Sequence, residues 1–232
     1  MAKVVDMEKV TTIPDRLFID LEESIIEGRL PIGSKISEPE LSREYGVSRG
    51  ALREAIGRLE ACGLVERKAN IGARVVSLSH DQLIEIYHVR EALEGMAARQ
   101  AALAITEQEL DSLKVLLEKH DHDIKDDQSH AYFQKQGDLD FHFRIVQGSH
   151  NRYLINLLCN DLYHLVRLYR YQYGMPSKRG PQAFDEHRYI VYAIERRDAE
   201  MAEHMMRAHV RASRENVERL FSESAEIDVI SE

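Results

Sequence analysis

Apolar residues recur every three or four positions along most of this 232-residue chain, a spacing typical of amphipathic helices. The pattern predicts a helix over 14–27, a short helix over 38–45 and a longer helix that follows Ser48 and ends before Gly63. Residues 64–78 differ, because short apolar stretches flank an Asn-Ile-Gly turn and predict a β-hairpin. Further helices are expected at 80–104, from 107 onward, and at about 128–148, 151–173, 181–196 and 199–221.

Polar residues that cap helices stand directly before four of these segments. A Ser or Thr followed three residues later by Glu or Gln has the spacing of a capping box, in which each side chain can bond the other residue's backbone N–H. Ser48 is the expected N-cap of the helix that follows it. The capping pairs are Ser37 with Glu40, Ser79 with Gln82 and Thr106 with Glu109.

The N-terminal elements occur in the order of a winged helix-turn-helix. A short helix, a turn containing Gly and a longer helix form the arrangement whose second helix enters the DNA major groove. Ser48, Arg49 and Arg53 cluster at the start of that second helix, where side chains meet base edges and phosphates. Lys68 adds a positive charge to the predicted wing. We therefore predict a DNA-binding domain over residues 1–78, the alternative being an ordinary helical domain with a solvated basic helix.

Charge is unevenly distributed along the chain. The formal net charge is -9, so the protein is not expected to hold nucleic acid by bulk charge alone. Residues 43–74 are the exception, because they carry seven basic and four acidic side chains and so a net charge of +3. This window coincides with the predicted helix-turn-helix and wing, which favours DNA as a partner.

Composition is that of an ordinary soluble protein. The chain contains 44% hydrophobic and 31% charged residues. Its length of 232 residues is enough for two domains. No apolar stretch approaches the roughly 18 to 20 residues of a membrane helix, and the N-terminus lacks a secretory pattern, so we expect a cytoplasmic protein without a membrane partner. Cys62 and Cys159 are far apart and outside any CxxC, which argues against a disulfide framework or a thiolate zinc site.

Residues 79–232 show helical spacing and no sustained strand alternation. They predict an all-α bundle of six or seven helices, which we expect to bind an effector and to form a dimer. The predicted fold class is therefore mainly α, with a small β wing in the N-terminal domain. The acidic end of the chain, after residue 221, is expected to fray.

Four residues of this second domain have a pattern suited to a metal ion. Asp138 and His142 are one helical turn apart, so both can reach one ion. His187 and His209 lie eleven residues before and eleven residues after Asp198, at a short turn between two predicted helices. In an antiparallel hairpin such residues come side by side, and both imidazoles could face the same interior as Asp138 and His142.

Simpler explanations for these residues exist. An Asp and a His one turn apart are common on surface helices, and a single buried His is more often a hydrogen-bonded core residue than a ligand. Spacing alone leaves both possibilities open. His120 and His122, in the acidic stretch "EKHDHDIKDD", are interpreted as part of a solvated helix end and not as ligands.

The stretch "PIGSKISEPELSREYGVSRGALREAIGRLEACGLVERKANIGARVV" resembles the DNA-binding domain of the GntR family of bacterial transcription regulators. The resemblance covers nearly all of residues 13–78, with the PxGxxxxExxL, GVSR and LREAxxRLE motifs in order. It implies that Arg49, Arg53 and Gly72 contact DNA, with Ser48 on a phosphate or a base. Pro39 departs from the family pattern, since many members have an arginine there that touches DNA.

The second domain resembles the FadR-type C-terminal domain of one branch of that family, called the FCD domain. The similar segments are "DLDFHFRIVQGSHN", "EHRYIVYAI" and "RAHV", and the resemblance runs from about 80 to 221. In metal-binding members the corresponding Asp and three His are the ligands, which implies that Asp138, His142, His187 and His209 bind a metal ion here.

Three imidazoles and one carboxylate suit a divalent Zn, Ni, Mn or Fe ion and leave coordination positions open. A small carboxylate effector can fill an open position while an arginine binds it through a bidentate contact. Salt bridges to neighbouring acids are the alternative role for each arginine. The candidate effector-binding residues are Arg90, Arg144, Arg167 and Asn151.

We therefore predict a transcription regulator and not an enzyme. A homodimer is expected to read a short palindromic operator in double-stranded DNA, because one recognition helix offers too few contacts for specific binding. A carboxylate bound beside the ion is expected to modulate that binding, with repression the default suggested by the resemblance. The alternatives are a regulator that senses the metal itself, a purely structural metal, and a metalloenzyme with a DNA-binding appendage.

Overall fold

A computed structural model describes residues 12–68, 72–77, 79–126, 137–172 and 179–230 of the chain. Within these ranges, the side chains of 122–126, 137–140, 172 and 223–230 are not described. The chain forms two compact units. The first consists of residues 1–78 and 160–173, and the second of 79–159 and 174–232.

The first unit combines the N-terminal elements with one helix from late in the sequence. Its buried apolar residues form one cluster, which includes Leu21, Ile25, Leu52 and Ile56 and extends to Leu168 of the late helix. The cluster therefore includes residues from every helix that the structure describes in this unit. The elements are α1 (Ile13–Ile26), α2 (Glu38–Glu44), α3 (Arg49–Ala61), β1 (Val65–Lys68), β2 (Gly72–Val75) and α8 (Tyr163–Gln172).

The wing is a two-stranded antiparallel hairpin in which Val65 pairs with Val75 and Lys68 with Gly72. Residues 69–71, which include part of the predicted turn, lie outside the described residues. The Arg74 guanidinium donates two hydrogen bonds to the carbonyl oxygen of Gly33, which fastens β2 to the loop before α2. The fold class predicted from the pattern, mainly helical with a small wing, is confirmed.

The four predicted N-caps are confirmed with one correction. Thr106 and Glu109 exchange hydrogen bonds as a capping box at the start of α5, and the Ser48 and Ser79 hydroxyls accept backbone N–H groups three residues on. Ser37 is also an N-cap, but its side chain accepts no capping hydrogen bond. The backbone carbonyl of Ser37 takes that role, because it accepts from the N–H groups of both Glu40 and Leu41.

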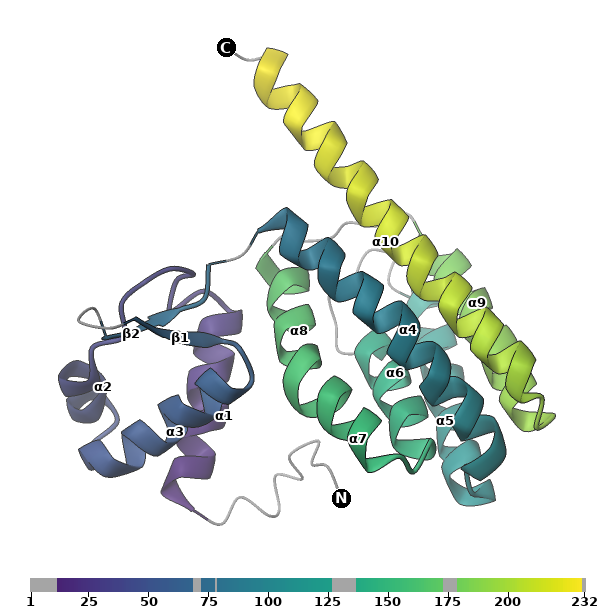
Figure 1. The fold of residues 1–232 in the computed structure, drawn as a ribbon, viewed down its shortest axis with the longest axis horizontal. Coiled ribbons are helices and arrows are strands. Elements are labelled where there is room, and N and C mark those ends of the chain that lie inside the picture. The colour runs from purple at the N-terminus through teal and green to yellow at the C-terminus, as the bar shows by residue number, and fades with distance from the viewer. Residues whose placement is uncertain (1–11, 69–71, 78, 127–136, 173–178, 231–232) are drawn as a thin grey trace. The chain divides into compact units, whose positions relative to one another are not determined.

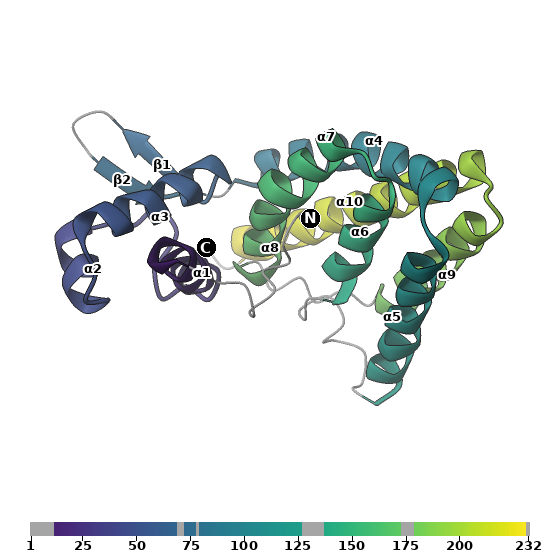
Figure 2. The same cartoon turned by 90° about the horizontal axis from the view of Figure 1, so that it is seen from below.

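In its described residues the second unit contains helices and no strands. Helix α4 lies beside the first part of α10, and α9 packs against both α4 and α5 (Figures 1 and 2). Gly95 permits the close approach of α4 and α10, because a Cβ there would collide with the Arg207 side chain. The helices are α4 (His80–Ala104), α5 (Glu107–Asp126), α6 (Gly137–Gly148), α7 (Arg152–Ile155), α9 (Gly180–Glu195) and α10 (Ala199–Ile230).

Two helix predictions need correction. The single helix expected over 151–173 is interrupted by a π-helical segment, Asn156–Leu162, between α7 and α8, and the border between the two units falls inside it. Helix α10 continues to Ile230, beyond its predicted end at 221. Residues 128–136, predicted to begin another helix, lie outside the described residues.

In the part of the chain that is described, no helix is long and apolar enough to cross a bilayer.

Candidate metal centre and nucleic-acid interface

Helix α3 has one buried face and one exposed basic face. Leu52, Ile56 and Leu59 are completely buried against the rest of the first unit. Arg49 and Arg53, one turn apart, are exposed on the other side of the helix. An exposed basic face at the N-terminus of the second helix is what a helix-turn-helix presents to the major groove.

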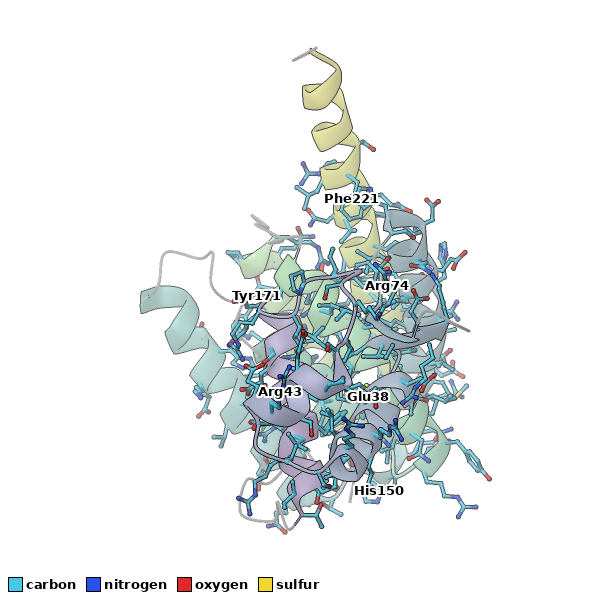
Figure 3. All side chains as sticks on the ribbon, turned by 90° about the vertical axis from the view of Figure 1, so that its left-hand side faces the viewer. Glu38, Arg43, Arg74, His150, Tyr171 and Phe221 are labelled. Carbon is cyan, nitrogen blue, oxygen red and sulfur yellow. The ribbon has the colours of Figure 1, made fainter. Side chains whose placement is uncertain are left out.

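Arg49 and Arg53 differ in their bonding partners. Arg53 Nε donates to Glu38 Oε2 at 2.7 Å, so a residue of α2 holds the Arg53 guanidinium. Glu38 is labelled in Figure 3. Among the described residues, no hydrogen bond or ion pair engages Arg49. The Ser48 hydroxyl oxygen already accepts from Ala51 N–H at 3.2 Å, which leaves its own hydrogen as the group it could offer to a phosphate.

The predicted contact residues of the wing differ in their local structure. Lys68 is exposed and pairs with Glu66 at 2.9 Å, while the adjacent Gly72 has a φ of +93°, which favours glycine. Arg74, counted among the basic residues of this window, instead bonds Gly33 and has a structural role.

Three histidines from three helices of the second unit meet at one buried point. His142 of α6, His187 of α9 and His209 of α10 are all at most 2% exposed. The Nε2 atoms of His187 and His142 each lie 3.2 Å from Nε2 of His209. One ring nitrogen from each residue lies within 4.8 Å of the other two, a spacing that allows one metal ion to bind all three. The phenyl ring of Phe141 stacks on the His187 ring, with centroids 3.8 Å apart.

Two carboxylates lie behind these imidazoles. Nδ1 of His142 is 2.5 Å from Oε2 of Glu94, and Nδ1 of His209 is 2.7 Å from Oε2 of Glu186. A carboxylate beside Nδ1 favours the tautomer that carries its proton there, because the N–H can then donate to it. In that tautomer Nε2 has a lone pair and no proton.

This geometry favours a cation at the centre. If Nδ1 carries the proton in both His142 and His209, two Nε2 lone pairs face each other across 3.2 Å and repel. A positive ion between them turns that repulsion into attraction and is the arrangement that metal-binding histidines show. The residues present therefore fit a divalent transition metal.

Glu94 is the most completely buried acid near the histidines. Its side chain is 0% exposed, and its Oε1 accepts from Arg90 Nε at 2.6 Å. Burial by itself disfavours the ionised form, but the charge of Arg90 and the contact with His142 outweigh it and lower the pKa of Glu94 to about 2. Glu94 is therefore a carboxylate at any physiological pH.

Asp138, the fourth predicted ligand, lies in the first turn of α6, one turn before His142. Its side chain is outside the part of the chain whose side chains are described. Its role as a ligand stays a prediction.

The candidate effector residues have other partners. Arg90, 1% exposed, is bound to Glu94 next to the histidine cluster. Arg144 is exposed and bonds Ser112 on α5, and Asn151 caps α7 and donates to Gln100. The structure thus places only Arg90 beside the cluster within the second unit, and the effector role of all these residues stays a prediction.

Arg167 belongs to the first compact unit. Its guanidinium and the His164 ring both contact Oε1 of Glu22 on α1, at 3.2 and 2.8 Å. Burial opposes ionisation of Glu22, but the His164 hydrogen bond and the charge of Arg167 hold the pKa of Glu22 below its usual value. The sequence pattern "YHLVRLYR" therefore fastens α8 to α1.

His120 corrects the prediction of a solvated helix end, because its side chain is only 3% exposed. It follows Leu113, Leu116 and Leu117 at helical spacing on the buried face of α5. The side chain of His122 lies outside the described residues.

Cys62 and Cys159 are buried free thiols, and burial raises the pKa of each to about 12, which makes them unreactive near neutral pH.

Sequence reasoning gave Glu94 as an acid that could pair with a neighbouring arginine but missed its contact with His142, and it missed Glu186 and Arg179 altogether. A signal for Glu94 was available, since it follows Arg90 by four residues on the face of α4 that also carries Tyr87. Glu186 precedes His187 in sequence but contacts His209 on the next helix, which spacing on one helix does not reveal.

Comparison with known proteins agrees with this architecture. Residues 15–75 match the family described as bacterial regulatory proteins, gntR family, and residues 85–212 match the FCD domain. The chain is 30% identical over 222 residues to YdhC, named as an uncharacterized HTH-type transcriptional regulator of Bacillus subtilis, covering 95% of this chain and 97% of that protein. It is also 30% identical over 210 residues to a probable D-xylose utilization operon transcriptional repressor of Paenarthrobacter nicotinovorans, covering 87% of each.

Solved structures support the fold. The structure of Escherichia coli McbR/YncC aligns with a TM-score of 0.71 and 21% sequence identity, covering 91% of this chain and 100% of that chain. The family matches together span both the DNA-binding elements and the histidine cluster. The chain belongs to the GntR family of bacterial transcription regulators and carries a C-terminal FCD domain.

Proposed function

We propose that this DNA-binding regulator is a cytoplasmic repressor whose operator affinity changes when a small carboxylate metabolite binds beside a divalent metal ion. In this proposal residues 1–78 form the DNA-binding domain and 79–232 the effector-binding and dimerisation domain. The observation that carries it is the convergence of three buried imidazole Nε2 atoms, two of them backed by carboxylates.

His142, His187 and His209, with Asp138, are the residues that would hold the ion. A Zn, Ni, Mn or Fe ion bound there would supply Lewis-acidic positions for a carboxylate oxygen. Among the candidate effector residues, Arg90 is linked to this centre through Glu94, which touches both Arg90 and His142. It is our candidate for the second contact to the carboxylate.

Names of relatives support control of metabolic genes. One similar protein is named a D-xylose utilization operon repressor, and another, from Escherichia coli strain K12 and 28% identical, is named the Glc operon transcriptional activator. Repression is the direction that we propose for this chain. An activator would bind the same operator and raise transcription, which a reporter fused to the operator distinguishes.

A two-fold dimer is the form that we propose for binding a palindrome. On α4, Val89, Met96 and Leu103 are 45%, 40% and 67% exposed and follow one another at seven-residue intervals. Such spacing aligns them along one face of the helix, the pattern of a helix that packs against another helix. The face of α4 that carries these three residues is therefore our candidate for contact with a second copy.

Met96→Lys is expected to convert the dimer to a monomer, because a two-fold axis would place the introduced charge in the contact twice. Sedimentation at micromolar concentration measures the mass. Val115→Lys, at an apolar position of α5 that is 63% exposed, is the matched control and should remain dimeric. An unchanged mass for Met96→Lys would place the dimer contact elsewhere.

Thermal unfolding tests the binding proposal directly. Metal-loaded protein and chelator-treated protein are heated with a panel of small carboxylic acids, including lactate, sugar acids and di- and tricarboxylates. A ligand at about 100 times its dissociation constant adds roughly 2.7 kcal/mol of stability, so one acid should raise the melting temperature only when metal is present.

The other outcomes discriminate between the alternatives. Stabilisation by metal with no response to any acid would favour a regulator that senses the metal or a metal with a structural role. Conversion of an acid to a product by the metal-loaded protein would identify an enzyme. Stabilisation by an acid in chelator-treated protein would contradict binding beside the ion.

A further inference from the structure

We propose that two arginine–glutamate–histidine relays position the imidazoles of the metal centre, with Glu94 and Glu186 as their positioning residues. The relays are Arg90–Glu94–His142 and Arg179–Glu186–His209. This inference rests on the proposed metal site, but its structural part concerns the histidine tautomers and can be measured without any metal.

The first relay is fully buried. Oε1 of Glu94 accepts from Arg90 at 2.6 Å while its Oε2 lies 2.5 Å from Nδ1 of His142, so one carboxylate oxygen lies beside each partner. The guanidinium also lies 5.0 Å from the centre of the Tyr87 ring, an attractive position for a cation. Arg90 compensates the charge of a carboxylate that has no contact with water, and that carboxylate in turn fixes the ring of His142 with Nε2 toward the other histidines.

The second relay repeats this chemistry on different helices. Arg179, at the N-cap of α9, contacts the same oxygen of Glu186 that lies 2.7 Å from Nδ1 of His209. Arg179 also donates to Ser213 Oγ at 3.0 Å, which ties the start of α9 to α10. Glu186 is 25% exposed, so this relay is in contact with solvent while the first is not.

The two relays together explain the orientation of the cluster. An unsupported imidazole exchanges its proton between Nδ1 and Nε2, and only the form with the proton at Nδ1 offers Nε2 to a metal. Each carboxylate favours that form for its own histidine. Because a neutral amide pulls the Nδ1 proton less strongly than a carboxylate, Gln at either position should weaken the preference without changing side-chain size.

The experiment compares Glu94→Gln and Glu186→Gln with controls from neighbouring positions. Glu91→Gln is the control on α4, where Glu91 pairs with Arg211 on α10, and Asp185→Asn is the control on α9, where Asp185 is exposed. Nitrogen-15 NMR of the histidine rings in metal-free full-length protein reports each tautomer. Competition of zinc with a chelating dye reports affinity.

The expected result is a crossed pattern. Glu94→Gln should mix the tautomers of His142 and leave those of His209 unchanged, and Glu186→Gln should do the reverse. Each variant should bind zinc about 10 to 100 times more weakly, as loss of a partner behind a metal ligand does elsewhere, while both controls bind as wild type.

Several results would overturn the relays. Unchanged tautomers in both variants, or both histidines affected equally by either variant, would remove the positioning role. If Glu94→Gln fails to fold because Arg90 loses its buried partner, Glu186→Gln at the partly exposed position still decides. If variants of a protein that binds no zinc still show the crossed pattern, the proposed metal site is refuted and the relays stand. If both Gln variants bind zinc as tightly as wild type, the metal site stands and the relays are refuted.

Discussion

His187→Ala is expected to abolish metal binding and leave DNA contacts intact. His187 contributes one of three converging Nε2 atoms, and its side chain is 0% exposed. Removing a partner behind a ligand costs about 10 to 100-fold in affinity, and removal of a ligand itself should cost at least about 100-fold. Equilibrium dialysis with zinc measures the loss.

The variant also removes the ring that stacks on Phe141, so a general loss of folding must be excluded. His187→Gln retains more of the side-chain volume and should show the same loss of zinc. His204→Ala, on an exposed position of α10, is the matched control and should keep full occupancy. Full metal occupancy in His187→Ala would show that the assigned ligand set is wrong.

Arg49→Ala is expected to weaken operator binding by about 1 to 3 kcal/mol, the size of a bidentate base contact, and to leave zinc content unchanged. The guanidinium is exposed at the start of α3, and no ion pair within the described residues competes with DNA for it. Fluorescence anisotropy with an operator selected from random duplexes measures the affinity.

Arg16→Ala on the exposed side of α1 is the control for loss of one positive charge in the same unit. It should change affinity only through weak, salt-dependent attraction. If Arg49→Ala and Arg16→Ala weakened binding equally for every DNA sequence, Arg49 would be a charge and not a base-reading contact.

Local signals in the sequence predicted much of the fold. The capping pair Thr106 and Glu109 forms as expected, and Ser48 starts the recognition helix, because caps act within one turn and need no tertiary information. The histidine cluster was also predictable in part, since the equal distances of His187 and His209 from Asp198 follow from the geometry of a helical hairpin.

Contacts between distant segments were the part that the sequence did not reveal. Nothing in the spacing of "YHLVRLYR" indicated that Arg167 would pair with Glu22, some 145 positions earlier in the chain. The π-helical segment Asn156–Leu162 was likewise not predicted from the apolar spacing. Glu94 and Glu186 act across helices, so only the packing of α4, α6, α9 and α10 makes them neighbours of the ligands.

Operator binding of the full-length protein, titrated with the acid that stabilises it, tests the central claim most directly. We predict that this acid changes operator affinity about 5 to 150-fold in metal-loaded protein and leaves the affinity of chelator-treated protein unchanged, as coupling between two sites requires. His187→Ala should bind the operator without responding to the acid. An operator affinity that follows free metal and ignores the acid, or that responds equally with and without metal, would contradict the account.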